Sequence, residues 1–197
     1  MLNTCFRSLT MIALLLSASV AMAAQYNLDA KQSSLYFVSI KNDNVTETHH
    51  FTALSGSIDA EGKAQIGVQL ASVETHIPIR NERMQSMFFD VVKMPTAVIS
   101  AHISKALLKQ LNSGAVIDQA LPVTIELQGK QATQNSELRI VVLANGDVQV
   151  STKNPLIIDA AAFGLADGVE QLREIAGLKS ISTIVPVTAT LLFSKDK

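Results

Sequence analysis

Two arginines, Arg80 and Arg83, are the side chains in this sequence whose type and spacing best suit the binding of a charged group. They lie three residues apart, so on a helix they share one face and present two guanidinium groups side by side. A guanidinium group is planar and binds a phosphate or a carboxylate through two parallel hydrogen bonds. The pair is therefore a candidate contact for a polar head group. The alternative interpretation is a solvated helix face on which Arg80 pairs with Glu82 or Asp90.

The other residues with reactive or metal-binding side chains form no recognisable motif. Cys5 is the only cysteine, and neither a Gly-x-Ser-x-Gly motif nor a glycine-rich phosphate loop is present. No metal-ligand spacing links the four histidines, which are His49, His50, His76 and His102. Strand positions can bring His49 and His102 together, but isolated histidines on an exposed strand are more often solvated. We therefore predict no catalytic residue, no metal site and no cofactor.

Two aromatic residues, Phe88 and Phe89, follow the arginines and lead into Asp90 and Pro95. A proline favours an extended backbone in the residue before it, so any helix that carries the arginines ends ahead of Pro95. We interpret Phe88 and Phe89 as anchors that pack this segment onto the rest of the fold. Lining the opening of a ligand cavity is the alternative role.

The segments around these residues alternate between apolar and polar side chains with period two, which is typical of half-buried β-strands. The alternation is clearest in residues 64–70, 121–128 and 185–193. Less regular strand candidates are residues 26–28, 35–41, 45–59, 96–103, 137–143 and 148–158. Asn145 and Gly146 join two of these candidates and predict a type I′ hairpin turn, because both residue types tolerate a positive φ.

Two or three short helices are expected to interrupt the strands. Pro78 suits a first helical turn that continues through residues 79–87, and residues 104–111 form a weaker candidate. A third helix is predicted to begin with Asp167 as its cap, to use Glu170 as the capping-box partner, and to stop at Gly177. Its apolar residues share a face that we expect to pack against the sheet, namely Val169, Leu172, Ile175 and Ala176.

About eight antiparallel strands in one domain must protect their edges, and closure into a barrel does so. We therefore predict an all-β fold: a soluble antiparallel barrel of about eight strands with two or three short helices. With no tryptophan and two tyrosines, the chain lacks the aromatic girdles of an outer-membrane barrel. Small aliphatic side chains dominate the strand faces, a composition that suits an ordinary core and an apolar tunnel equally. Nine residues are candidates to line such a tunnel: Phe37, Ile66, Val68, Leu70, Ile99, Val123, Ile125, Val185 and Val187.

Residues 1–23 have the features of a secretory signal peptide. Arg7 precedes an apolar run over residues 9–16, and Ala21 and Ala23 flank Met22 in a small-x-small cleavage site. The apolar run is too short for a membrane span, so we expect residues 24–197 to form one exported domain with no transmembrane segment. The net charge of −1 and the lack of a basic stripe argue against a nucleic-acid partner.

Motifs spread over the mature chain match one protein family. They are the opening YNLDAKQSSLYF, Gly56 and Ile58, Ser72-Val73-Glu74-Thr75, Arg80, Met84 and Ser86, Phe88-Phe89-Asp90 with Pro95 beyond, and Phe163-Gly164-Leu165. On these residues the chain resembles the YceI-like family of polyisoprenoid- and lipid-binding proteins. It departs from the family pattern where Asn81 replaces the usual Asp and Arg83 the usual His.

The resemblance implies an extended, lipocalin-like antiparallel barrel, often dimeric, that holds a long isoprenoid or fatty chain in its interior. It also implies export to the periplasm of a Gram-negative bacterium. On this basis we expect a non-enzymatic periplasmic protein that binds a long-chain lipid, with a homodimer as one expected assembly. A protein-interaction or stress-response module with a filled barrel is the first alternative. An unrecognised enzyme, with His102 or Asp159 facing inward, is the second.

Overall fold

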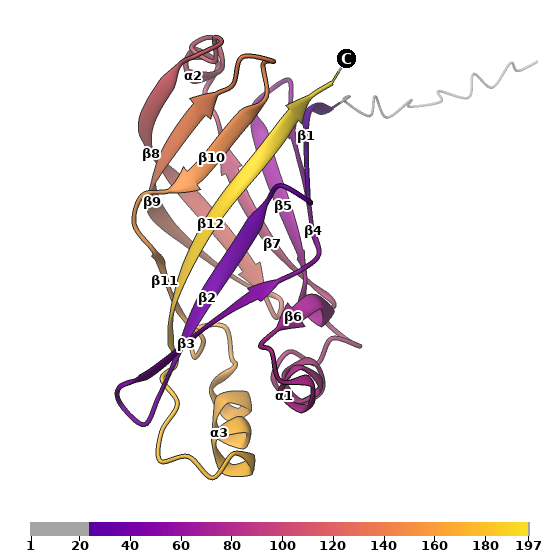
Figure 1. Cartoon of the computed structure of the whole chain (residues 1–197), viewed down its shortest axis with the longest axis vertical. Coiled ribbons are helices and arrows are strands. Elements are labelled where there is room, and N and C mark those ends of the chain that lie inside the picture. The colour runs from indigo at the N-terminus through magenta and orange to yellow at the C-terminus, as the bar shows by residue number, and fades with distance from the viewer. Residues whose placement is uncertain (1–23, 197) are drawn as a thin grey trace, which may run out of the picture.

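Eight strands close into an antiparallel barrel in the computed structural model, which describes residues 24–196 (Figure 1). In order around the barrel they are β1 (Ala24–Leu28), β4 (Leu54–Asp59), β5 (Lys63–Gln69), β7 (Thr96–His102), β8 (Val116–Leu127), β9 (Lys130–Val142), β10 (Val148–Thr152) and β12 (Ile184–Lys195). Pairing of β1 with β12, where Tyr26 lies opposite Lys195, closes the ring. The predicted barrel is confirmed, while the predicted signal peptide lies outside the described residues.

Four further strands lengthen the barrel at one end: β2 (Ser34–Lys41), β3 (Val45–Phe51), β6 (Val73–Glu74) and β11 (Leu156–Asp159). β1 and β2 pair one after the other with β12, since Leu28 lies opposite Phe193 and Ser34 lies opposite Thr190. β4 and β3 likewise pair in succession with β1 and β2. β1 with β2, and β4 with β3, therefore resemble two long strands that are each interrupted once. For this reason the sheet extends beyond the closed ring.

Strand positions follow the predicted alternation, with differences at interruptions and ends. The predicted strand 45–59 is split at Thr52 and Ala53, and the predicted strand 148–158 is split ahead of Leu156. β8 and β9 are longer than predicted and pair over their whole length. Period-two alternation missed their extra residues because polar side chains occupy both faces there.

The turn between β9 and β10 is not the predicted type I′ turn. Only Gly146 has a positive φ, of 88°, whereas that turn type requires a positive φ at Asn145 as well. The Asn145 side chain instead accepts a hydrogen bond from the backbone N–H of Asp147 at 3.1 Å. This local bond gives Asn145 a reason to adopt another backbone conformation.

Besides the single 3₁₀ turn η1 (Leu70–Ser72), residues 24–196 form three short α-helices, and two of these sit at the same end of the barrel. They are α1 (Pro78–Arg83), which continues as one π-helical turn η2 (Met84–Phe88), α2 (Lys105–Leu108) and α3 (Ala166–Ile175). Figure 1 shows α1 and α3 below the barrel with the β2–β3 hairpin, and α2 at the opposite end. We call these the mouth end and the α2 end.

The start of α3 differs from the prediction. Its N-cap position is Leu165, which makes no side-chain cap, and Asp167 lies inside the first turn. Glu170 binds Arg173 at 2.6 Å instead of completing a capping box. The predicted stop at Gly177 is consistent with its φ of 63°, because glycine adopts the left-handed conformation that follows a helix at little cost.

Candidate functional site

The barrel interior contains three adjoining cavities that follow one another from the mouth end towards the α2 end. Their volumes are about 280, 130 and 100 Å³, and we call them the mouth, middle and deep cavities. The mouth and middle cavities share Phe37 and Phe88 in their walls, and the middle and deep cavities share Leu35 and Ile99. Side chains therefore divide one long interior space into three compartments.

All nine residues predicted to line a tunnel lie in the walls of these cavities. Phe37 and Val185 separate the mouth and middle cavities; Val68, Leu70 and Ile125 line the middle cavity; Ile99 and Val187 separate the middle and deep cavities; Ile66 and Val123 line the deep cavity. Every side chain that lines the middle cavity is apolar. Contact of these residues with a ligand stays a prediction.

The apolar face of α3 covers the mouth cavity, and part of it also packs against the barrel as predicted. Val169 belongs to a buried cluster with Val123 and Ile125 of β8, and Leu172 packs against the main core. The four apolar residues of α3 all lie in the wall of the mouth cavity: Val169, Leu172, Ile175 and Ala176. They share a face as the helical period requires, and α3 crosses the open end of the barrel, so this face also meets the cavity (Figure 1). α3 is therefore one wall of the mouth cavity.

Polar side chains reach only part of this interior, and most of them line the mouth cavity. They are Ser39, Lys41, His49, Arg80, Arg83 and Ser182. Both predicted head-group residues, Arg80 and Arg83, are among them. No aspartate or glutamate belongs to the described lining of this cavity, so its wall is cationic.

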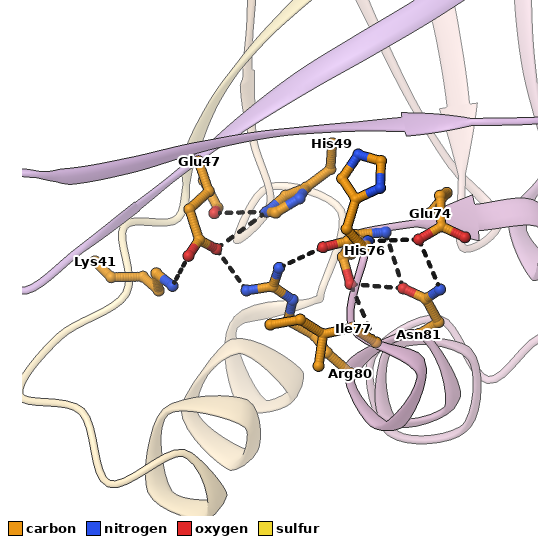
Figure 2. A network of polar contacts seen from close by, with 10 residues as sticks. Lys41, Glu47, His49, Glu74, His76, Ile77, Arg80 and Asn81 are labelled. Carbon is orange, nitrogen blue, oxygen red and sulfur yellow. Dashed lines mark hydrogen bonds and ion pairs between the residues drawn. The ribbon is translucent and has the colours of Figure 1, made fainter.

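Arg80 is held in place from two sides, as Figure 2 shows. It donates to the Glu47 carboxylate at 2.5 Å and to the Thr75 carbonyl at 2.7 Å. The suggested partners Glu82 and Asp90 are therefore wrong; the true carboxylate comes from β3, which is distant in sequence. Glu47 also pairs with Lys41 at 2.7 Å, and hydrogen bonds from Lys41 first and Arg80 second lower the pKa of the Glu47 carboxyl.

Asn81 fastens the start of α1 to the neighbouring strand β6. Its side-chain oxygen accepts from the Thr75 N–H at 2.9 Å and from the Thr75 hydroxyl at 2.6 Å, and its amide donates to Glu74 at 3.1 Å. These bonds position the residue next to Arg80 (Figure 2). Asn81 therefore holds Thr75, whose carbonyl accepts a hydrogen bond from Arg80, and it does not line the cavity itself.

His49 is a site residue that the sequence interpretation missed. It was expected to be solvated, yet it is 3% exposed and lies in the mouth-cavity wall. Its Nε2 forms a 3.0 Å hydrogen bond with the Ser39 hydroxyl. Burial, and secondly the Arg80 charge, lower the pKa of His49 to about 4, so the ring is neutral near pH 7. The strand register explains why His49 faces inward. His49 lies opposite Phe37, which was predicted to line the tunnel, so both side chains lie on the same face of the sheet.

Two nitrogen atoms in the mouth cavity are buried without a hydrogen-bond partner among the described residues, His49 Nδ1 and Arg80 Nε. A buried polar group that stays unpaired is costly, so such atoms usually mark a missing partner. Arg83 lines the same cavity and forms no ion pair with another residue of the described chain. Arg83 is therefore the side chain in this wall whose donors are free to bind a polar ligand, and the two buried nitrogen atoms belong to neighbouring residues of the same wall.

Phe88 and Phe89 were predicted either to anchor their segment or to line the cavity opening. Phe89 is buried and packs against Phe51 and Phe88, with ring centroids 6.0 and 4.7 Å apart. Phe88 lies between the mouth and middle cavities. Gly168 of α3 approaches it so closely that a Cβ there would lie 3.0 Å from the Phe88 ring. Phe89 is therefore an anchor that also lines the middle cavity, and Phe88 lies in the walls of both the mouth and the middle cavities.

The residues suggested for an unrecognised enzyme do not face the cavities. His102 and Asp159 are both exposed, and His102 lies opposite Lys63, far from His49. Within residues 24–196 no group of three His, Cys, Asp or Glu side chains is placed to hold a metal ion. No helix of that part of the chain has the length and apolar character needed to cross a membrane.

Comparison with known proteins identifies relatives of this fold. The YceI-like domain family matches residues 26–193. A polyisoprenoid-binding domain from Saccharophagus degradans, implicated in plant cell wall breakdown, is 35% identical with a TM-score of 0.84, over 88% of this chain and all of that one. No match was found among curated proteins.

Two more distant structures share the fold. Burkholderia cenocepacia BcnA is 20% identical, with a TM-score of 0.62 over 84% of this chain and 98% of that chain. A Campylobacter jejuni YceI protein is 16% identical, with a TM-score of 0.51 over 76% of this chain and 84% of that chain.

Proposed function

This chain belongs to the YceI-like family, and from that premise we propose that it is a periplasmic binding protein for a long-chain isoprenoid or fatty-acid-like lipid. The tail of the lipid occupies the middle and deep cavities, and its head group lies in the mouth cavity. The 35% identical domain from Saccharophagus degradans, which binds polyisoprenoid, supports this ligand class. The signal-peptide pattern of residues 1–23 supports export, and the family resemblance supports the periplasm and a homodimer.

The observation that carries the proposal is the series of apolar cavities along the barrel. Burial of apolar surface contributes about 25 cal/mol per Å², so a hydrocarbon chain inside such walls binds without specific polar contacts. The alternative, an interaction or stress-response module, needs a filled barrel. Three cavities in series favour the lipid over that alternative.

We expect the protein to recognise oxygen atoms of the head group, which accept hydrogen bonds from its donors. Arg83 supplies guanidinium donors from the wall of the mouth cavity, beside Arg80 in the same wall. Phosphate, carboxylate and carbonyl oxygens all fit this set. The Glu47 carboxylate and the Thr75 carbonyl already bind the two terminal nitrogen atoms of Arg80. Arg83 is therefore the guanidinium group that can form two parallel hydrogen bonds with a head group.

Organic extraction of protein purified from its native host, followed by mass spectrometry, tests the proposal. We expect a long-chain lipid in the wild-type extract and its loss in Val123→Glu, because the new carboxylate would lie in the deep cavity among apolar side chains. Val116→Glu is the matched control, since Val116 lies on the same strand and is exposed. It should retain the lipid.

A second variant separates loss of binding from loss of folding. Val123→Phe introduces no charge and occupies part of the deep cavity, so a folded Val123→Phe protein should bind less of the longest lipids. Wild-type protein that yields no lipid, or folded cavity variants with unchanged lipid content, would count against the proposed function.

A further inference from the structure

Three isoleucines are exposed around the mouth cavity. Ile77 and Ile79 flank the start of α1 and are 43% and 51% exposed, and Ile175 ends α3 and is 46% exposed. All three also lie in the wall of the mouth cavity. Single exposed apolar residues are ordinary, but three of them from two helices around one opening form an apolar rim. An exposed apolar rim of this kind is typical of a surface that contacts a membrane, a ligand or another protein.

We propose that this mouth end docks on a lipid bilayer, and that the bound lipid moves between bilayer and barrel through the mouth cavity. The inference rests on the proposed function for the identity of the cargo. It adds where on the molecule exchange takes place and what surface the protein recognises.

The charges at this end are mixed, because exposed carboxylates lie on α1 and α3, whereas the cations line the cavity; these carboxylates are Glu82, Asp167, Glu170 and Glu174. The mouth-cavity wall carries Lys41, Arg80 and Arg83 and no carboxylate among its described residues. Glu47, behind the wall, pairs with Lys41 and Arg80 and offsets part of that charge, whereas Arg83 is unpaired within the described chain. A Lys or Arg near an anionic leaflet contributes about 1 kcal/mol to binding.

The physical need for docking comes from the tail of the lipid. Exposing one CH₂ group to water costs about 0.8 kcal/mol, so a long chain rarely crosses water alone. Contact of Ile77, Ile79 and Ile175 with the headgroup boundary gives the tail an apolar path from the bilayer to the cavities. A rim of three isoleucines exposes far less than the roughly 800 Å² per partner of a stable protein interface. The rim therefore suits a membrane surface better than a second copy.

Because the chain has no tryptophan, one engineered tryptophan reports on each end. Ile79→Trp places the probe on the rim, and Val116→Trp places it at the α2 end, where Val116 is 62% exposed. On adding vesicles of phosphatidylcholine and phosphatidylglycerol, we expect a blue shift and reduced acrylamide quenching for Ile79→Trp only. Equal shifts at both positions, or no shift at Ile79→Trp, would overturn the docking proposal.

Two further variants test the separate contributions in a vesicle flotation assay. Replacing Ile77, Ile79 and Ile175 together by serine should abolish flotation, and these positions are exposed enough for the fold to survive. Arg83→Gln should weaken binding to anionic vesicles about fivefold and leave binding to pure phosphatidylcholine unchanged. If both variants float with vesicles as well as the wild type does, the proposal is contradicted.

Failure of docking and failure of the proposed function give different results. Lipid in the extract without a vesicle-dependent shift removes the docking surface and leaves the carrier. A vesicle-dependent shift without lipid in the extract supports docking and removes the carrier. A shift that appears without vesicles and grows with protein concentration identifies a second copy as the occupant and overturns the proposal.

Discussion

The two ends of the barrel differ in how their interiors are filled. At the α2 end, Phe193, Ile58 and Val148 are almost completely buried and leave a deep cavity of about 100 Å³. At the mouth end, side chains from α1, η2 and α3 enclose about 280 Å³ and bring cationic groups and a neutral histidine to the wall. The difference teaches that one end of the same barrel is closely packed, while the other leaves open space and polar groups in its wall.

The difference has its origin in how the strands end. At the α2 end, β1 pairs with both β12 and β4, so the hydrogen-bonded ring is complete. At the mouth end, β2, β3 and β6 continue the sheet, but helices take over where strands stop. A helix covers a barrel end with a single face, which leaves gaps that a strand lined with side chains would fill.

The largest expected effect concerns two phenylalanines at opposite ends. Phe193→Ala should lower the free energy of unfolding by about 3–5 kcal/mol, because Phe193 is among the most deeply buried side chains. Phe88→Ala should cost only about 1–2 kcal/mol, because Phe88 is partly buried beside existing cavities. Urea unfolding followed by circular dichroism measures both. Equal losses would remove the distinction between a closely packed end and an open end.

The next largest effect is a pH dependence of the free energy of unfolding that arises from His49 at the mouth end. The pKa of His49 is about 4 in the folded protein and about 6.5 in an unfolded chain. As the pH falls below 6.5, the unfolded chain binds the proton first, so stability declines until the pH reaches about 4. Between pH 7 and pH 5 the loss should be about 2 kcal/mol.

His49→Gln supplies the control for this pH dependence, since glutamine is polar and does not titrate. Urea unfolding at pH 7 and pH 5 should show a smaller difference for His49→Gln than for the wild type. Staying at pH 5 or above limits the contribution of Glu47, whose lowered pKa adds an acid-sensitive term mainly at lower pH. A wild-type protein equally stable at both pH values would show that His49 is not buried as described.

The smallest effect compares two carboxylates that each bind two cations. Glu47 binds Lys41 and Arg80 at the mouth end, and Asp118 binds Arg139 and Lys153 on exposed strands. Glu47→Gln should cost about 1–2 kcal/mol, because it leaves a partly buried Arg80 with a weaker partner. Asp118→Asn should leave the urea midpoint unchanged within error, since solvent screens exposed ion pairs. A larger effect of Asp118→Asn would reverse the comparison.

Much of the tunnel wall could be predicted because strand faces are a local property. The alternation of Val123 and Ile125 with polar neighbours is enough to place both on one face of β8. Once a barrel is assumed, that face must be the inner one. The nine tunnel candidates reached the cavity walls for this reason.

The helix predictions show where local reasoning stops. The 3.6-residue period correctly grouped Val169, Leu172 and Ile175 on one face of α3, but it did not predict that this face also covers a cavity. Capping at Asp167 also failed, because a capping box is one of several ways in which a helix can begin.

The sequence by itself determined the strands, the inner faces, the arginine pair and the family, since all of these are written in residue order and spacing. Only the tertiary structure decided which groups meet at the mouth. Glu47 reaches Arg80 across 33 positions, and His49 enters the cavity through its register with Phe37. Register and the placement of helices depend on pairing between distant segments, which no local pattern encodes.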